Sequence, residues 1–140
     1  MKKTCFIFVL WALTAVLAAC ADDTPPVVVT IADICQQESG TKISAEGYLA
    51  LPSFLICEGG QCQINFHDET SSVLVELVTT DNPRNNHLRL PPAQYTTADL
   101  SFILADGTPG DGTTPVKITG PVRRPSANVC YLDAHAVERP

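Results

Sequence analysis

Residues 42–49 read KISAEGYL and residues 116–122 read VKITGPV, and these two stretches decide the expected fold. Each alternates between apolar and polar side chains, a period of two that predicts a strand with one buried face. Each also places a glycine, Gly47 or Gly120, on the apolar face. Glycine inside a strand marks a bulge or a sharp bend, so both stretches predict the strongly coiled strands that close a small barrel.

Further strands are predicted on either side of these two stretches. Residues 52–57 and 61–66 have the pattern of two hairpin arms around Gly59 and Gly60. Residues 72–78 predict another strand, and their mixed apolar pattern favours burial on both faces. Residues 129–137 predict the last strand. Its expected inward face consists of Cys130, Leu132, Ala134 and Ala136.

A helix is expected only near the start of the domain. Thr30 and Asp33 form a capping-box pattern and Gly40 is a suitable stop, so we predict one short helix over residues 30–38. Residues 79–114 carry weaker signals. They predict a polar loop over 81–86, then either a helical turn opening at residue 97 or a short strand over 100–104, and a loop over 106–114.

The first twenty residues, MKKTCFIFVLWALTAVLAAC, have the pattern of an export signal. Two lysines precede about a dozen apolar residues, a core typical of secretory leaders and too short to span a bilayer comfortably. The run LAAC at 17–20 resembles the lipobox of bacterial lipoprotein precursors. That resemblance implies cleavage before Cys20 and attachment of fatty acyl chains, such as palmitate, to it. The alternatives are an ordinary secretory leader or an uncleaved membrane helix.

The expected layout therefore has three parts: a signal peptide over 1–19, a lipidated Cys20 with a polar tether over 20–29, and one domain over 30–140. Two or three acyl chains would anchor the product stably on the extracytoplasmic side of a membrane. In a Gram-negative host, Ala21 implies the periplasmic face of the outer membrane. The expected locations are thus the cell envelope and, through the lipid anchor, a membrane surface.

Charge argues against nucleic acid as a partner. Without residues 1–19, the chain has seven basic and fifteen acidic side chains, which gives a formal charge of −8. Only Arg123 and Arg124 are adjacent basic residues, whereas a nucleic-acid-binding domain concentrates its positive charge in a patch.

Four cysteines remain beyond Cys20: Cys35, Cys57, Cys62 and Cys130. An even number behind an export signal predicts two disulfides, and four cysteines allow three connectivities. We favour Cys57–Cys62, across a glycine-rich turn, together with Cys35–Cys130. The alternative is a zinc site built from Cys57, Cys62 and His67 in a C-x4-C-x4-H spacing, with His135 as a fourth ligand. That spacing is not a tight zinc pattern, so we expect no metal.

The order of these signals resembles a known group of barrels. A short helix leads into a strand containing EGYL at 46–49, and VKITGPV recurs before the final strand. This arrangement is similar to that of bacterial OB-fold envelope proteins and tRNA-anticodon-like OB domains, over roughly residues 30–140. The resemblance implies a mainly β, five-stranded barrel and carries no catalytic residues. The four cysteines and the insert over 79–114 depart from the pattern. A β-sandwich is the alternative fold.

No catalytic motif is present, so we expect neither enzyme activity nor a cofactor. The chain lacks a G-x-S-x-G nucleophile motif and a phosphate-binding glycine loop. His67, Asp68 and Ser71 could be read as a triad, but neighbouring strand residues point to opposite faces. Asp106 and Asp111 could be read as a calcium loop, but their spacing does not follow the EF-hand pattern.

Two functions fit these expectations. The first is a binding module that holds a small ligand, a glycan or another envelope protein, with Tyr48, Tyr95 and Tyr131 as candidate contact residues. Each tyrosine could instead pack across strands. The second function is a structural or accessory subunit of an envelope assembly, with no ligand of its own.

Overall fold

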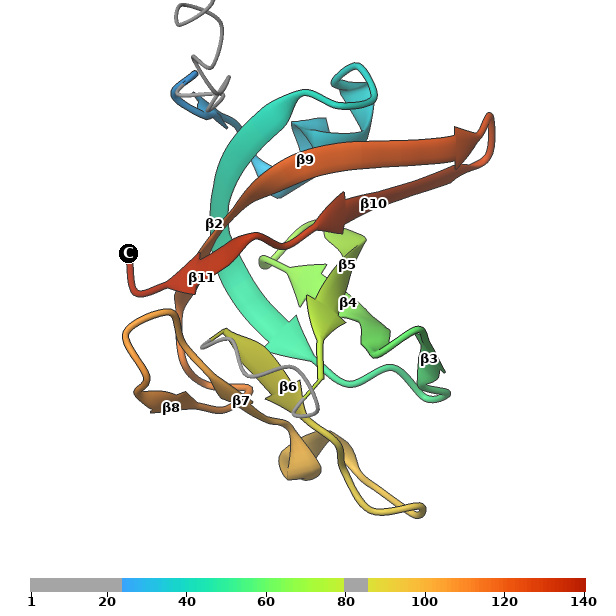
Figure 1. Ribbon diagram of the computed structural model, residues 1–140, viewed down its shortest axis with the longest axis vertical. Coiled ribbons are helices and arrows are strands. Elements are labelled where there is room, and N and C mark those ends of the chain that lie inside the picture. The colour runs from blue at the N-terminus through green and yellow to red at the C-terminus, as the bar shows by residue number, and fades with distance from the viewer. Residues whose placement is uncertain (1–23, 80–85) are drawn as a thin grey trace, which may run out of the picture.

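The computed structural model describes residues 24–79 and 86–140 (Figure 1). The predicted signal peptide and Cys20 lie outside these residues, as does most of the polar loop predicted over 81–86. No helix among the described residues is long and apolar enough to cross a membrane. The elements in chain order are β1 (Val27–Val28), η1 (Ile31–Gln36), β2 (Lys42–Ala50), β3 (Ile56–Glu58), β4 (Gln61–His67), β5 (Ser72–Val78), β6 (His87–Arg89), η2 (Thr97–Asp99), β7 (Ser101–Ile103), β8 (Pro109–Gly110), β9 (Val116–Ser126), β10 (Val129–Asp133) and β11 (Ala136–Glu138).

Five strands close into a ring. β2 pairs antiparallel with β4, and β4 pairs antiparallel with β5. β5 then runs parallel to β10, β10 pairs antiparallel with β9, and β9 returns antiparallel to β2. The predicted OB-like five-stranded barrel is therefore confirmed, and the sandwich alternative is set aside.

The predicted bend at Gly47 lies where β2 changes partners. β2 pairs with β9 from Lys42 to Gly47, and with β4 from Tyr48 onward. A Cβ at position 47 would lie 2.6 Å from both the His67 carbonyl oxygen and Ile31 Cδ1. Only glycine lets the strand turn this corner without displacing its neighbours.

The predicted final strand is wrong in one respect, because the structure divides it into β10 and β11. The chain breaks register at Ala134 and His135, where the His135 amide donates to the Thr119 carbonyl oxygen. Gly120 lies against this break, and a Cβ there would overlap the backbone carbonyl of Asp133. Beyond the break, Val137 is buried and Ala136 is only half-buried, so the inward face predicted to include Ala136 shifts by one residue.

Short elements close the two ends of the barrel (Figure 1). At one end η1 buries Ile31 and Ile34. At the other, the small sheet β6–β7–β8 adds Leu88 and Phe102 to the same core. This sheet lies in the insert over 79–114, whose sequence carried weaker signals. The helical turn predicted from residue 97 and the strand predicted over 100–104 are both present, as η2 and β7.

Four further expectations need correction. The predicted helix over 30–38 is a 3-10 helix of six residues, and Thr30 Oγ1 donates to Asp33 Oδ2 at 2.7 Å instead of capping the backbone. β3 covers only the last part of the hairpin arm predicted over 52–57. β5 is buried on one face only, and Leu74 on its other face is 36% exposed. The loop predicted over 106–114 contains the two-residue strand β8.

Both favoured disulfides are present in the structure. Cys35 is joined to Cys130, which ties η1 to β10. Cys57 is joined to Cys62 across the β3–β4 hairpin. Gly59 and Gly60 form the turn between them with φ of +60° and +80°, a backbone conformation that favours glycine.

Candidate functional site

The barrel presents one broad sheet face to solvent, formed by β4, β5 and β10. Along β4 the buried residues Cys62, Ile64 and Phe66 alternate with half-buried residues that point outward. The same alternation holds along β5 and in the middle of β10. We call the resulting surface the outer face. It consists of Gln63, Asn65, Leu74, Glu76, Tyr131 and Asp133.

Strand register arranges these six side chains in two rows. Asn65 lies opposite Leu74, and Leu74 lies opposite Tyr131. In the next row Gln63 lies opposite Glu76, and Glu76 lies opposite Asp133. Directly opposed residues on one face of a sheet are within interaction distance. A row of amide, aliphatic and aromatic side chains therefore runs beside a row of amide and carboxylate groups.

Charge on the outer face is partly compensated. The Arg123 guanidinium donates to Asp133 Oδ2 from Nε at 3.1 Å and from Nη2 at 2.9 Å. His135 Nε2 lies 3.7 Å from the same oxygen. Glu76 forms no ion pair of this kind among the described residues, and its carboxylate accepts a hydrogen bond from the Gln63 side chain. Asp133 is therefore held by the Arg123 guanidinium, whereas Glu76 remains open to a ligand.

Burial and neighbouring charge shift two pKa values on this face. Burial, and then the charge of Asp133, raise the pKa of Glu76 above its usual value, against the smaller lowering effect of the Gln63 hydrogen bond. Burial, followed by the charges of Glu76 and Asp133, raises the pKa of Tyr131. The Tyr131 hydroxyl therefore stays protonated and can donate a hydrogen bond at neutral pH.

The structure separates the three candidate tyrosines. Tyr131 lies in the outer face. Tyr48 is 40% exposed at the edge of that face, with its ring centroid 6.2 Å from that of His67. Tyr95 lies in the connection between β6 and β7, where its hydroxyl donates to the Pro52 carbonyl oxygen at 2.9 Å. This hydrogen bond gives Tyr95 a structural role in a loop, which differs from the packing across strands that the sequence analysis offered as the alternative.

Sequence reasoning did not single out Glu76, Asp133, Gln63 or Arg123. Alternation along residues 61–67 could have placed Gln63 on an outward face. No local signal places Glu76 beside Asp133, because the parallel pairing of β5 with β10 brings them together.

The three aspartates considered in the sequence, Asp68, Asp106 and Asp111, form turns. Asp68 Oδ1 accepts hydrogen bonds from the backbone amides of Thr70 and Ser71, each at 2.8 Å. These bonds lower the Asp68 pKa and close the β4–β5 turn. Asp106 and Asp111 accept in the same way from threonines two residues later.

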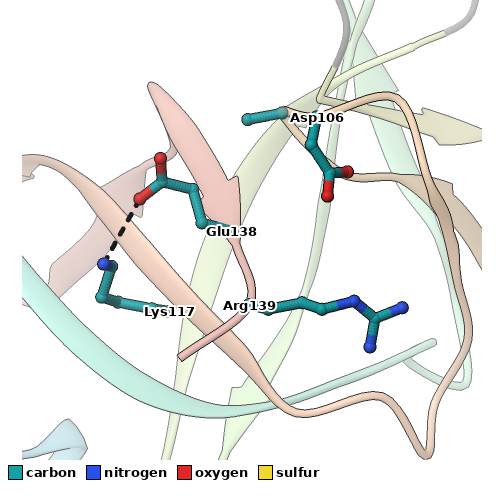
Figure 2. Close-up of a pocket in the computed structure, with 5 residues that line it drawn as sticks. Asp106, Lys117, Glu138 and Arg139 are labelled. Carbon is teal, nitrogen blue, oxygen red and sulfur yellow. Dashed lines mark ion pairs between the residues drawn. The ribbon is translucent and has the colours of Figure 1, made fainter.

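One other surface is a weaker candidate for a ligand site. A depression of about 490 Å³ is lined by Ala105, Asp106, Lys117, Glu138 and Arg139, four of which are labelled in Figure 2. Lys117 Nζ there lies 3.4 Å from Glu138 Oε2, so the charge of the lysine is already balanced.

Among residues 24–79 and 86–140, no group of three or more His, Cys, Asp or Glu side chains is arranged to hold a metal ion. Because Cys57 and Cys62 are joined, neither offers a thiolate to zinc.

Comparison with known proteins supports the fold. No family model matches the chain, and no curated protein matches it in sequence. The solved structure of the hypothetical protein ygiW from E. coli is similar, with a TM-score of 0.50 and 12% sequence identity over 81% of this chain and 90% of that one. This likeness shows an OB-like barrel and nothing finer. The S. pombe Stn1–Ten1 complex is less similar, with a TM-score of 0.43 and 14% identity over 84% and 78% of the two chains.

Proposed function

We propose that this chain is an extracytoplasmic lipoprotein whose barrel is a small, non-enzymatic binding module. Its ligand is a neutral molecule rich in hydroxyl groups, such as a glycan, held on the outer face. The observation that carries this proposal is the pair of adjacent rows, Asn65–Leu74–Tyr131 and Gln63–Glu76–Asp133.

The chemistry of the two rows favours hydroxyl groups. The Tyr131 ring offers a flat surface with a polar tip, against which a sugar ring can pack. Carboxylate and amide oxygens accept hydrogen bonds from hydroxyl groups, and the amide NH2 groups donate them. The carboxylates of Glu76 and Asp133 would repel a phosphate backbone, which disfavours nucleic acid. Because β4, β5 and β10 are paired with neighbours on both sides, with β3 covering Gln61–Gln63 of β4, the structure as it stands offers an extended peptide no free edge beside this face.

Two features support the extracytoplasmic location. The LAAC run at 17–20 resembles a lipobox, and the two disulfides are compatible with an oxidising compartment. Lipidation is tested by growing cells with an alkyne-tagged fatty acid and measuring the mass of the purified protein. The expected product begins at an acylated Cys20, and Cys20→Ser removes the label. A mature protein that still begins at Met1 and carries no lipid would refute the anchor.

Ligand binding is tested by titrating 15N-labelled protein with soluble oligosaccharides, for example an N-acetylglucosamine tetramer and maltotetraose, with a short single-stranded DNA as a control. We expect amide shifts clustered on β4, β5 and β10 with an oligosaccharide and none with DNA. Tyr131→Ala should weaken binding about tenfold or more, equivalent to about 1.4 kcal/mol. The matched variant Tyr95→Phe should leave affinity unchanged, because Tyr95 lies outside the outer face. Saturable shifts with DNA, or none with any oligosaccharide, would refute this ligand class.

The absence of catalysis is tested in the same samples. After prolonged incubation, chromatography should recover each oligosaccharide intact. Cleavage that is lost in Glu76→Gln would instead identify the carboxylate pair as catalytic.

A further inference from the structure

The β3 strand is a short arm attached to the rim of the barrel. It lies off the closed ring and, within residues 24–79 and 86–140, pairs only with β4, through Ile56–Gln63, Cys57–Cys62 and Glu58–Gln61. All three of its residues are exposed, and Ile56 reaches 56%. Figure 1 shows β3 projecting from the side of the barrel beside β4. This arm is held to the barrel by its pairing with β4 and by the Cys57–Cys62 disulfide.

The disulfide that fastens this arm has one exposed and one buried cysteine. Cys57 and Cys62 are directly opposed in the hairpin, with their Cα atoms 4.0 Å apart. Cys57 is exposed, whereas Cys62 is fully buried and lies opposite Leu77 of β5. A thiolate in solution therefore has access to the bond from the Cys57 side.

The second disulfide has a different position and a different effect on the chain. Cys35–Cys130 joins residues 95 positions apart, and both cysteines pack partly buried against the core. Cys57–Cys62 joins residues only five positions apart. A short closed loop restricts the unfolded chain much less than a long one. Opening Cys57–Cys62 therefore leaves intact the long-range link and the seven residue pairs between β4 and β5.

We propose that Cys57–Cys62 is a thiol-exchange site that fastens β3 to the edge of β4. A dithiol reductant, such as a thioredoxin-like protein, opens it while Cys35–Cys130 stays closed. A thiolate of the reductant attacks Cys57 Sγ, the Cys57–Cys62 bond breaks, and Cys62 leaves as a thiolate that takes up a proton. The second thiolate of the reductant then attacks the reductant's first sulfur, which is bonded to Cys57 in the mixed disulfide. This step releases Cys57, which is protonated. The reductant becomes a disulfide as two electrons and two protons pass to the two cysteines.

Release of β3 changes the edge of the barrel. The backbone groups of β4 that paired with β3 between Gln61 and Gln63 become free, and an unpaired strand edge is a site where an extended segment can add. This role goes beyond the proposed function, because it requires no ligand on the outer face. The experiment below measures thiols and amide protection and uses no oligosaccharide, so its outcome is independent of ligand binding.

Selectivity is tested on the native protein purified in detergent. Samples are equilibrated with increasing dithiothreitol, the free thiols are trapped with iodoacetamide, and the alkylated peptides are quantified by mass spectrometry. We expect half-maximal alkylation of Cys57 and Cys62 at a reductant concentration at least tenfold lower than for Cys35 and Cys130, which serve as the internal control. Simultaneous opening of both disulfides, or earlier opening of Cys35–Cys130, would overturn the proposal.

Release of the arm is tested by amide hydrogen exchange at the reductant concentration that opens only Cys57–Cys62. Amides of residues 56–63 that bond between β3 and β4 should exchange at least tenfold faster than in the oxidised protein, while those that bond between β4 and β5 and those of β9 stay unchanged. The double variant Cys57→Ser/Cys62→Ser should show the same fast exchange without reductant. The measurement on the reduced wild-type protein decides the question even if this variant does not fold. Unchanged protection of residues 56–63 after selective reduction would overturn the release.

Discussion

The substitution Gly120→Ala tests the arrangement that shapes both the barrel and the outer face. Gly120 lies opposite Ile43 of β2 and directly against the break between β10 and β11. A Cβ at this position would overlap the Asp133 carbonyl oxygen, and it would lie 2.9 Å from the Asp133 carbonyl carbon and 3.1 Å from the His135 amide nitrogen. These atoms belong to the backbone, so no side-chain rotation relieves the overlap.

The expected cost is at the upper end of the range for overpacking, about 3 kcal/mol. For a domain of this size, that loss corresponds to a fall in Tm of about 12 °C. The matched control is Gly112→Ala, because a Cβ at position 112 would meet nothing closer than the Leu49 carbonyl oxygen at 3.6 Å. That control should leave stability unchanged or raise it by about 0.4–1 kcal/mol, since alanine restricts the unfolded chain more than glycine does.

Urea unfolding, followed by far-UV circular dichroism, measures both variants against the wild type. Because the carbonyl displaced in Gly120→Ala belongs to Asp133, amide shifts of β10 should also change in this variant and not in Gly112→Ala. If the two variants were to differ by less than about 0.5 kcal/mol, the close approach of β9 to the β10–β11 break would be refuted.

Three further predictions concern charge, a hydrogen bond and the disulfides. The pKa of Glu76 is raised in the folded state, so the wild type should gain stability as the pH falls from neutral towards the pKa of Glu76 in the unfolded chain. In a series of urea titrations from pH 7 to pH 4, Glu76→Gln should lose this gain. Tyr95→Phe removes the hydrogen bond to the Pro52 carbonyl oxygen and should cost about 1 kcal/mol in thermal unfolding; an unchanged Tm would contradict a structural role for that hydroxyl. Cys35→Ser/Cys130→Ser should cost about 4–5 kcal/mol of unfolding free energy, against about 2 kcal/mol for Cys57→Ser/Cys62→Ser, because the first pair closes a far longer loop; equal losses would contradict the loop-length argument.

The local errors in the sequence analysis have physical causes. Residues 72–78 include Leu74, whose apolar side chain made the strand resemble one buried on both faces, yet Leu74 is exposed because nothing among the described residues covers the outer face of the barrel. The break at Ala134 was missed because alternation continues through residues 130–136. That break depends on a hydrogen bond from the His135 amide to Thr119 of a different strand.

The amino-acid sequence alone determined the features that depend on near neighbours in the chain. Alternation placed β2 and β9, glycine inside strands predicted the bends at Gly47 and Gly120, and the turn at Gly59 and Gly60 brought Cys57 opposite Cys62. Local steric and solvation preferences suffice for these, because they act over a few residues.

Only the tertiary structure decided the composition of the outer face. Glu76 and Asp133 are opposed because β5 and β10 run parallel, and Tyr131 but not Tyr95 shares their surface. Parallel neighbours are joined by long connections, so their register comes from closing the ring around one core and not from the residues between them.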